Sequence, residues 1–183
     1  MEKKPTLFKN ALMYGVFTAI VLIVIDVVFY LTGLPSTSKI RYISFLFIIG
    51  GMMLGTIKYR DKVMGGYISY GKAFLSCFLI ALIAGLITAI YSYIFLSFID
   101  PAYLQTTIEQ GMEQSRAKLE AKGMSEEQIQ SSMDMASGFM KPGMMSLMAF
   151  FGTAIWGAIL ALIVSIFIKK ENKSFDAQVN DVQ

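Results

Sequence analysis

The chain contains no histidine, a single cysteine and only 4 prolines among its 183 residues. Without histidine it lacks both the usual general base of enzymes and the commonest metal ligand. One cysteine, Cys77, forms no disulfide within a chain and completes no Cys/His zinc site. Clustered carboxylates and nucleophile–base pairs are missing as well. We therefore predict a protein that is not an enzyme, with no catalytic residue, no metal site and no cofactor.

Charged residues are scarce within four long apolar stretches, at residues 8–31, 40–57, 70–99 and 143–168. Hydrophobic residues make up 55% of the chain, and its mean hydropathy of +0.58 is too high for an ordinary soluble domain. At about 1.5 Å per helical residue, even the shortest stretch nearly crosses a hydrocarbon core of about 30 Å. Strands of a membrane barrel are much shorter, about ten residues. We predict an all-α polytopic membrane protein with four transmembrane helices.

Residues 100–142 form the longest segment outside these stretches. Asp100-Pro101 is typical of a helix start, Gly123 of a helix end, and Ser125-Glu126-Glu127-Gln128 of a capping box that opens a second helix. Apolar residues recur on one face of each predicted helix: Leu104, Ile108, Met112 and Leu119, then Ile129, Met133, Ala136 and Met140. The pattern predicts a helical hairpin between the third and fourth spans, inserted in a single domain of residues 1–183 that ends in a tail, 169–183.

Lysine and arginine are distributed unevenly around the predicted spans. With the N-terminus in the cytoplasm, ten of the 16 would lie on the cytoplasmic side and six on the other. The positive-inside rule then places both termini in the cytoplasm and the hairpin outside it. The net charge of +3 therefore indicates topology, and we predict no nucleic-acid partner. Met1–Lys4 is also typical of a secretory signal, but the apolar run that follows exceeds the roughly 7 to 15 residues of a signal core, so we expect an uncleaved helix.

Three groups of loop residues resemble a known family. They are Lys58-Tyr59-Arg60-Asp61 with the run Gly65 to Phe74, Asp100-Pro101, and Gly123-Met124-Ser125-Glu126-Glu127-Gln128. The chain resembles, from about Phe8 to Lys170, an uncharacterised family of small four-span membrane proteins of the Bacteroidota type, domain-of-unknown-function family 4199. The resemblance implies a multi-pass protein of the bacterial cytoplasmic (inner) membrane. It supplies no activity, substrate or functional residue.

Asp26 stands inside the first apolar stretch, although a carboxylate at the centre of a membrane helix costs about 2.5 to 3.5 kcal/mol on insertion scales. It lies about 7 to 8 Å from the end of that helix. Arg41 and Lys39 begin the second stretch at a similar depth, and Tyr91 or Tyr93 can donate a hydrogen bond from the third. Two roles remain open: a structural ion pair of Asp26 with Arg41, or a proton- or cation-coupled binding site.

Four basic residues flank the loop between the second and third stretches: Lys58, Arg60, Lys62 and Lys72. The glycine and lysine spacing from Gly66 to Lys72 matches a P-loop, but no strand precedes it, and Ala73 stands where magnesium needs a Ser or Thr. Two interpretations of the basic residues remain. They are either an ordinary positive-inside anchor or a binding site for anionic lipid headgroups.

Small residues recur four positions apart in three of the stretches, for example Gly51 with Gly55 and Ala81 with Gly85. This spacing lets helices approach closely within a bundle, and a surplus face of this kind also supports a homo-oligomer. The 13 methionines include several between Met133 and Met148, where thioether ligands suit copper(I). Their helical spacing on apolar faces is more typical of packing.

Two functions from different classes fit these features. We favour an integral inner-membrane protein that acts as a non-enzymatic envelope or interaction module, with the lipid bilayer as its solvent and an envelope protein bound to residues 100–142. The alternative is a small oligomeric transporter or channel with Asp26 as the coupling residue. An Asp26 that faces a polar cavity favours transport, whereas an Asp26 sealed by Arg41 counts against it.

Overall fold

The computed structural model describes residues 5–35 and 38–170. In these ranges the chain is helical apart from turns and one isolated bridge, which confirms the all-α prediction. The α-helices are α1 (Leu7–Leu31), α2 (Ile43–Lys62), α3 (Tyr70–Ile94), α4 (Pro101–Ala121), α5 (Glu126–Ser137) and α6 (Pro142–Ile168). A 3-10 turn, η1 (Lys39–Tyr42), precedes α2, and a π-helical turn, η2 (Phe95–Ile99), extends α3. Most of the predicted tail, 169–183, and the basic start, Met1–Lys4, lie outside the described residues.

Four helical segments are long and apolar enough to cross a membrane: Leu7–Leu31, Lys39–Lys62, Tyr70–Ile99 and Pro142–Ile168. The second is longer than the predicted span, 40–57, because α2 continues through the charged residues to Lys62. Basic side chains in the last turn of a helix interact favourably with its partly negative end. The apolar run therefore marks the lipid-facing part of α2 and not its end.

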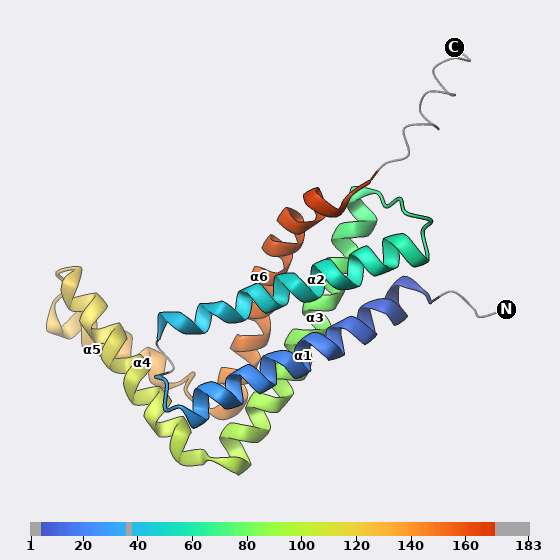
Figure 1. Ribbon diagram of the computed structural model, residues 1–183. Coiled ribbons are helices and arrows are strands. Elements are labelled where there is room, and N and C mark those ends of the chain that lie inside the picture. Colours follow the sequence, from blue (N-terminus) through green and yellow to red (C-terminus); the bar gives the residue numbers. More distant parts are fainter. Residues whose placement is uncertain (1–4, 36–37, 171–183) are drawn as a thin grey trace.

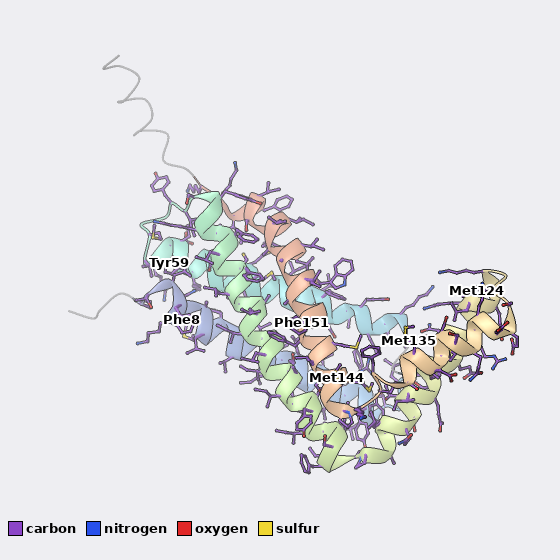
Figure 2. The ribbon with its side chains drawn as sticks, turned by 180° about the vertical axis from the view of Figure 1, so that it is seen from behind. Phe8, Tyr59, Met124, Met135, Met144 and Phe151 are labelled. Atoms are coloured by element: carbon purple, nitrogen blue, oxygen red, sulfur yellow. The ribbon has the colours of Figure 1, made fainter. Side chains whose placement is uncertain are left out.

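The membrane helices form a bundle in which α3 is central and packs against α1, α2 and α6 (Figure 1). The described chain begins and ends at the same end of this bundle, here called the terminal end. The hairpin α4–α5 projects from the opposite end, here called the hairpin end (Figure 1). In Figure 2, Phe8 and Tyr59 lie at the terminal end, whereas Met124 lies near the tip of the hairpin. The four spans therefore separate the hairpin from the terminal end.

Close contacts between small residues hold the terminal half of the bundle together. A Cβ atom added to Gly51 of α2 would come within 2.0 Å of Thr18 Oγ1 on α1. A Cβ on Gly157 of α6 would lie 2.8 Å from that of Ala81 on α3. The buried polar groups between them are bonded, since the Thr56 hydroxyl donates to Ser76 Oγ over 2.9 Å. Small residues thus let the helices touch, as the four-residue spacing predicts.

The hairpin begins at Asp100, which caps α4 as predicted. One carboxylate oxygen accepts a hydrogen bond from the Tyr103 amide (3.0 Å), and the other accepts one from the Tyr30 hydroxyl of α1 (2.7 Å). These two donors lower the pKa of Asp100 below its ordinary value. Gly123 ends the α4–α5 turn with a φ of +73°, and the predicted capping box of Ser125 and Gln128 opens α5. The carboxylate of Asp100 therefore links the hairpin to the bundle.

Candidate functional site

A membrane-embedded ion pair lies near the hairpin end. Arg41 of η1 donates from Nη2 to Asp26 Oδ1 of α1 over 2.5 Å, and its guanidinium lies 5.3 Å from the centre of the Phe29 ring. Asp26 stands five residues before the end of α1, a rise of about 7.5 Å. The structure therefore joins the two residues that the sequence marks as candidates. Among the described residues, Lys39 and Tyr93 make no bond to Asp26.

Two polar groups beside this pair are buried without a partner in the described part of the chain. They are Arg41 Nη1 and the hydroxyl of Tyr91 on α3. The Asp26 side chain is still 44% exposed, and one of its oxygens is engaged by Arg41. A buried donor without a partner costs about 1 to 3 kcal/mol. The site therefore contains hydrogen-bond donors, in Arg41 and Tyr91, and an acceptor, in Asp26, that can bind a further group.

Asp26 and Tyr91 belong to the wall of a cavity of about 430 Å³. Side chains from all four membrane helices line it: Leu22, Ile23 and Asp26 of α1, Ser44, Phe45 and Ile48 of α2, Gly85, Thr88, Ala89, Tyr91 and Ser92 of α3, and Ala149, Gly152, Thr153 and Trp156 of α6. Its size falls within the range of about 300 to 1,000 Å³ that small-molecule sites occupy. A cavity of this size is the natural candidate for a ligand site.

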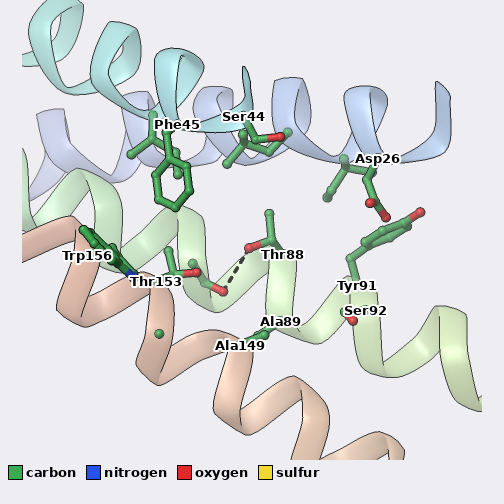
Figure 3. Close-up of a pocket in the computed structure, with 15 residues that line it drawn as sticks. Asp26, Ser44, Phe45, Thr88, Ala89, Tyr91, Ser92, Ala149, Thr153 and Trp156 are labelled. Atoms are coloured by element: carbon green, nitrogen blue, oxygen red, sulfur yellow. Dashed lines mark hydrogen bonds between the residues drawn. The ribbon is translucent and has the colours of Figure 1, made fainter. Parts of the chain in front are cut away.

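The cavity changes character along its length. Figure 3 shows Asp26, Tyr91 and Ser92 toward one side, with Phe45 and Trp156 toward the other. Trp156 is 14 residues from the start of α6, about 21 Å deeper than the hairpin end of that helix. The charged groups therefore lie near the membrane boundary, and the aromatic and aliphatic walls lie deeper.

Thr88, one of the hydroxyl-bearing residues of the cavity wall, is already bonded within its own helix. Thr88 Oγ1 donates to the carbonyl oxygens of Ala84 (3.0 Å) and Gly85 (3.1 Å) on its own helix. The ring of Trp156 meets Phe45 edge to face, with centroids 6.1 Å apart. The deep part of the cavity therefore combines two aromatic rings with threonine side chains, of which Thr88 is bonded to its own helix.

The four basic candidates at the terminal end divide into two kinds. Arg60 is committed within the fold, since Nε binds Asp61 (2.8 Å) and Nη1 donates to the Ile168 carbonyl at the end of α6 (3.1 Å). Lys58, Lys62 and Lys72 are exposed. Arg60 thus stabilises the end of α6, while the three lysines are available to surrounding headgroups.

Sequence reasoning missed the cavity and the bond between Tyr30 and Asp100. Polar residues inside apolar helices, such as Thr88 and Thr153, are the signal that was available for the cavity. The Tyr30–Asp100 bond joins residues 70 positions apart and leaves no local pattern. Trp156 lines the cavity and is 55% exposed.

These features define a multi-pass helical membrane protein with a polar-ended cavity at one end of its bundle. Residues 13–170 match the model of the family described as Protein of unknown function (DUF4199), so the chain belongs to that family. The family agrees with the resemblance of the loop sequences. Neither the curated proteins nor the solved structures include a match to the chain.

Proposed function

We propose that this protein is a non-enzymatic interaction module of the bacterial cytoplasmic membrane, in which the hairpin α4–α5 contacts an envelope protein. The observation that carries the proposal is the placement of the hairpin. It projects from the bundle (Figure 1), and Ile129 is the one buried residue of α5. Met135 is 72% exposed and Phe139 47% exposed, so large apolar side chains face outward from a polar arm.

The proposed orientation places the terminal end in the cytoplasm. Lys58, Lys62 and Lys72 are exposed there, where anionic headgroups attract basic residues by about 1 kcal/mol each. The hairpin then lies outside the cytoplasm, where an envelope partner would meet it. Labelling of engineered cysteines at Lys62 and at the exposed Lys122 in intact cells tests this orientation. Only the Lys122 position should react with an impermeant reagent, and the reverse pattern would contradict the proposal.

Crosslinking in living cells tests the hairpin contact. A photoreactive residue at Met135 or Phe139 should give the same protein adduct, whereas one at Met13, which is 59% exposed on the lipid-facing side of α1, should not. Met135→Lys should remove the adduct formed from position 139 while the protein still inserts. Adducts that differ between the two hairpin positions, or none at either, would reject the proposal.

A small oligomeric transporter with Asp26 as coupling residue is the alternative, and the cavity beside Asp26 favours it. Two observations weigh against it. Arg41 engages the carboxylate at 2.5 Å, and beyond the cavity the bundle is closed by fully buried residues such as Met52, Ile80 and Ala81. Proton and cation flux into liposomes separates the two functions. Equal flux for the wild type and Asp26→Asn, with folding unchanged, rejects transport through this residue.

A further inference from the structure

We propose that the cavity binds a zwitterionic phospholipid with a primary ammonium, of the phosphoethanolamine type. The ammonium binds Asp26, the phosphate binds Arg41, and part of an acyl chain fills the deep apolar section. This inference is independent of the hairpin partner, because it rests on the bundle alone.

Charge balance favours a zwitterion over a simple ion. Asp26 and Arg41 together are neutral, and a net charge added inside a membrane is expensive. A bound anion would use only Arg41 and a bound cation only Asp26, and either would leave the site charged. A headgroup with both charges keeps the net charge of the site at zero. It uses the exposed part of the Asp26 carboxylate together with Arg41 Nη1, which has no partner among the described residues.

Hydrogen bonding favours a primary ammonium over a quaternary one. The Asp26 carboxylate accepts bonds, and a primary ammonium donates up to three, whereas a trimethylated nitrogen donates none. The Tyr91 hydroxyl, buried without a partner in the described part of the chain, is a donor for a phosphate oxygen. Asp26 and Tyr91 of the cavity wall, together with Arg41 beside it, thus match the ammonium and the phosphate of one headgroup.

The orientation of the cavity matches that of a lipid in the adjoining leaflet. Its charged groups lie about 7.5 Å from the end of α1, where a headgroup meets the membrane. Leu22, Ile48 and Phe45 line the deeper section, where an acyl chain would run. Trp156 also lines the cavity and is 55% exposed, so the deeper section is not sealed at this residue.

The chain carries its own probe of occupancy, because Trp156 is its one tryptophan. The experiment titrates full-length, delipidated protein in detergent with lipids that carry brominated acyl chains and measures quenching of Trp156. Phosphatidylethanolamine, phosphatidylcholine and phosphatidylglycerol with identical chains are compared. We expect phosphatidylethanolamine to quench at a concentration at least tenfold lower than the other two.

Two glycines provide a matched pair of variants. A Cβ on Gly152, which lines the cavity, or on Gly50, which does not, would meet no atom within 4 Å. Gly152→Leu should fill the cavity and abolish the high-affinity quenching by phosphatidylethanolamine. Gly50→Leu should leave the quenching by phosphatidylethanolamine unchanged, because a leucine at position 50 lies outside the cavity wall.

The headgroup assignment has its own variant. Asp26→Asn should abolish the preference for phosphatidylethanolamine, with folding followed by circular dichroism. If this variant does not fold, Asp26→Asn combined with Arg41→Gln removes both charges and should lose the preference in the same way. Equal quenching by all three lipids, a preference for phosphatidylglycerol, or a preference that survives Gly152→Leu would overturn the proposal.

Discussion

The two halves of the bundle are built from the same helices but pack differently. In the terminal half, glycines bring helix backbones together, as where Gly51 meets Thr18 and Gly157 meets Ala81. In the hairpin half, where Gly85 still meets Thr153 closely, the helices enclose a cavity of about 430 Å³. Beside it, Arg41 Nη1 and the Tyr91 hydroxyl have no partner among the described residues. The first half needs no partner to be complete. The second contains the cavity and the unpartnered polar groups, so we place the proposed lipid site there, away from the best-packed residues.

The largest expected effect comes from disturbing the closed half. Gly51→Leu forces side-chain atoms into Thr18, because even a Cβ would lie 2.0 Å from its Oγ1. Overpacking of this kind typically costs about 1 to 3 kcal/mol, occasionally more, and we expect the upper part of that range. The free energy of unfolding in mixed micelles measures it. Gly50→Leu is the neighbouring control and should change stability by less than about 0.5 kcal/mol. Similar losses in both variants would show that the α1–α2 contact is not close.

The ion pair sets the next effect. Arg41→Gln leaves the Asp26 carboxylate without its 2.5 Å partner, and we expect a loss of about 1 to 3 kcal/mol in the free energy of unfolding. Adding Asp26→Asn should recover part of that loss, because no unpaired charge remains. A double-mutant cycle measures the coupling. Additive losses in the cycle would mean that the two side chains do not interact in the membrane.

The link between bundle and hairpin should depend on pH. The pKa of Asp100 is lower in the folded protein than in the unfolded chain. Its carboxylate therefore contributes fully to stability above the unfolded pKa of about 3.9, and this contribution is lost as the pH falls through the folded pKa. Tyr30→Phe removes the largest cause and should raise the pKa of Asp100 toward its ordinary value. Titration of the Asp100 carboxyl ¹³C signal measures this shift. An identical titration in the wild type and Tyr30→Phe would exclude the hydrogen bond.

The smallest effect concerns the tip of the hairpin. Arg116 of α4 binds Glu120 over 2.9 Å and also binds Glu126 of α5, and all three side chains are exposed. Exposed pairs contribute little, so Arg116→Gln should only modestly raise amide hydrogen exchange in α5. Lys118→Gln on the same helix is the control. A collapse of the hairpin in Arg116→Gln would mean that this exposed pair holds it together.

The overall fold follows from the sequence because lipid imposes strong rules. Long uncharged runs predict helices, and the caps at Asp100 and Ser125 are local patterns that the structure confirms. The end of α2 was harder to predict, since its charged last turns remain helical although they leave the apolar run. The capping residues thus predict the start of α4 and α5 more clearly than the apolar run predicts the end of α2.

The candidate site is only half visible in the sequence. Asp26 stands out because charge is rare in a span, and Arg41 follows from its depth. The cavity does not stand out in the sequence. It depends on the distance between α2, which carries Ser44, and α6, which carries Ala149. That separation is set by packing among four helices, and no spacing within one helix encodes it.

The central claim is that the hairpin half encloses an open cavity while the terminal half is closed, and cysteine crosslinking in a bilayer tests it most directly. In a Cys77→Ser background, one protein carries Thr56→Cys with Ser76→Cys, whose side-chain oxygens lie 2.9 Å apart in the closed half. The other carries Ser44→Cys with Ala149→Cys, which lie on opposite walls of the cavity (Figure 3). We predict that oxidation joins the first pair directly and that the second pair is joined only by a reagent with a spacer. Direct disulfide formation at equal rates in both pairs would contradict the account.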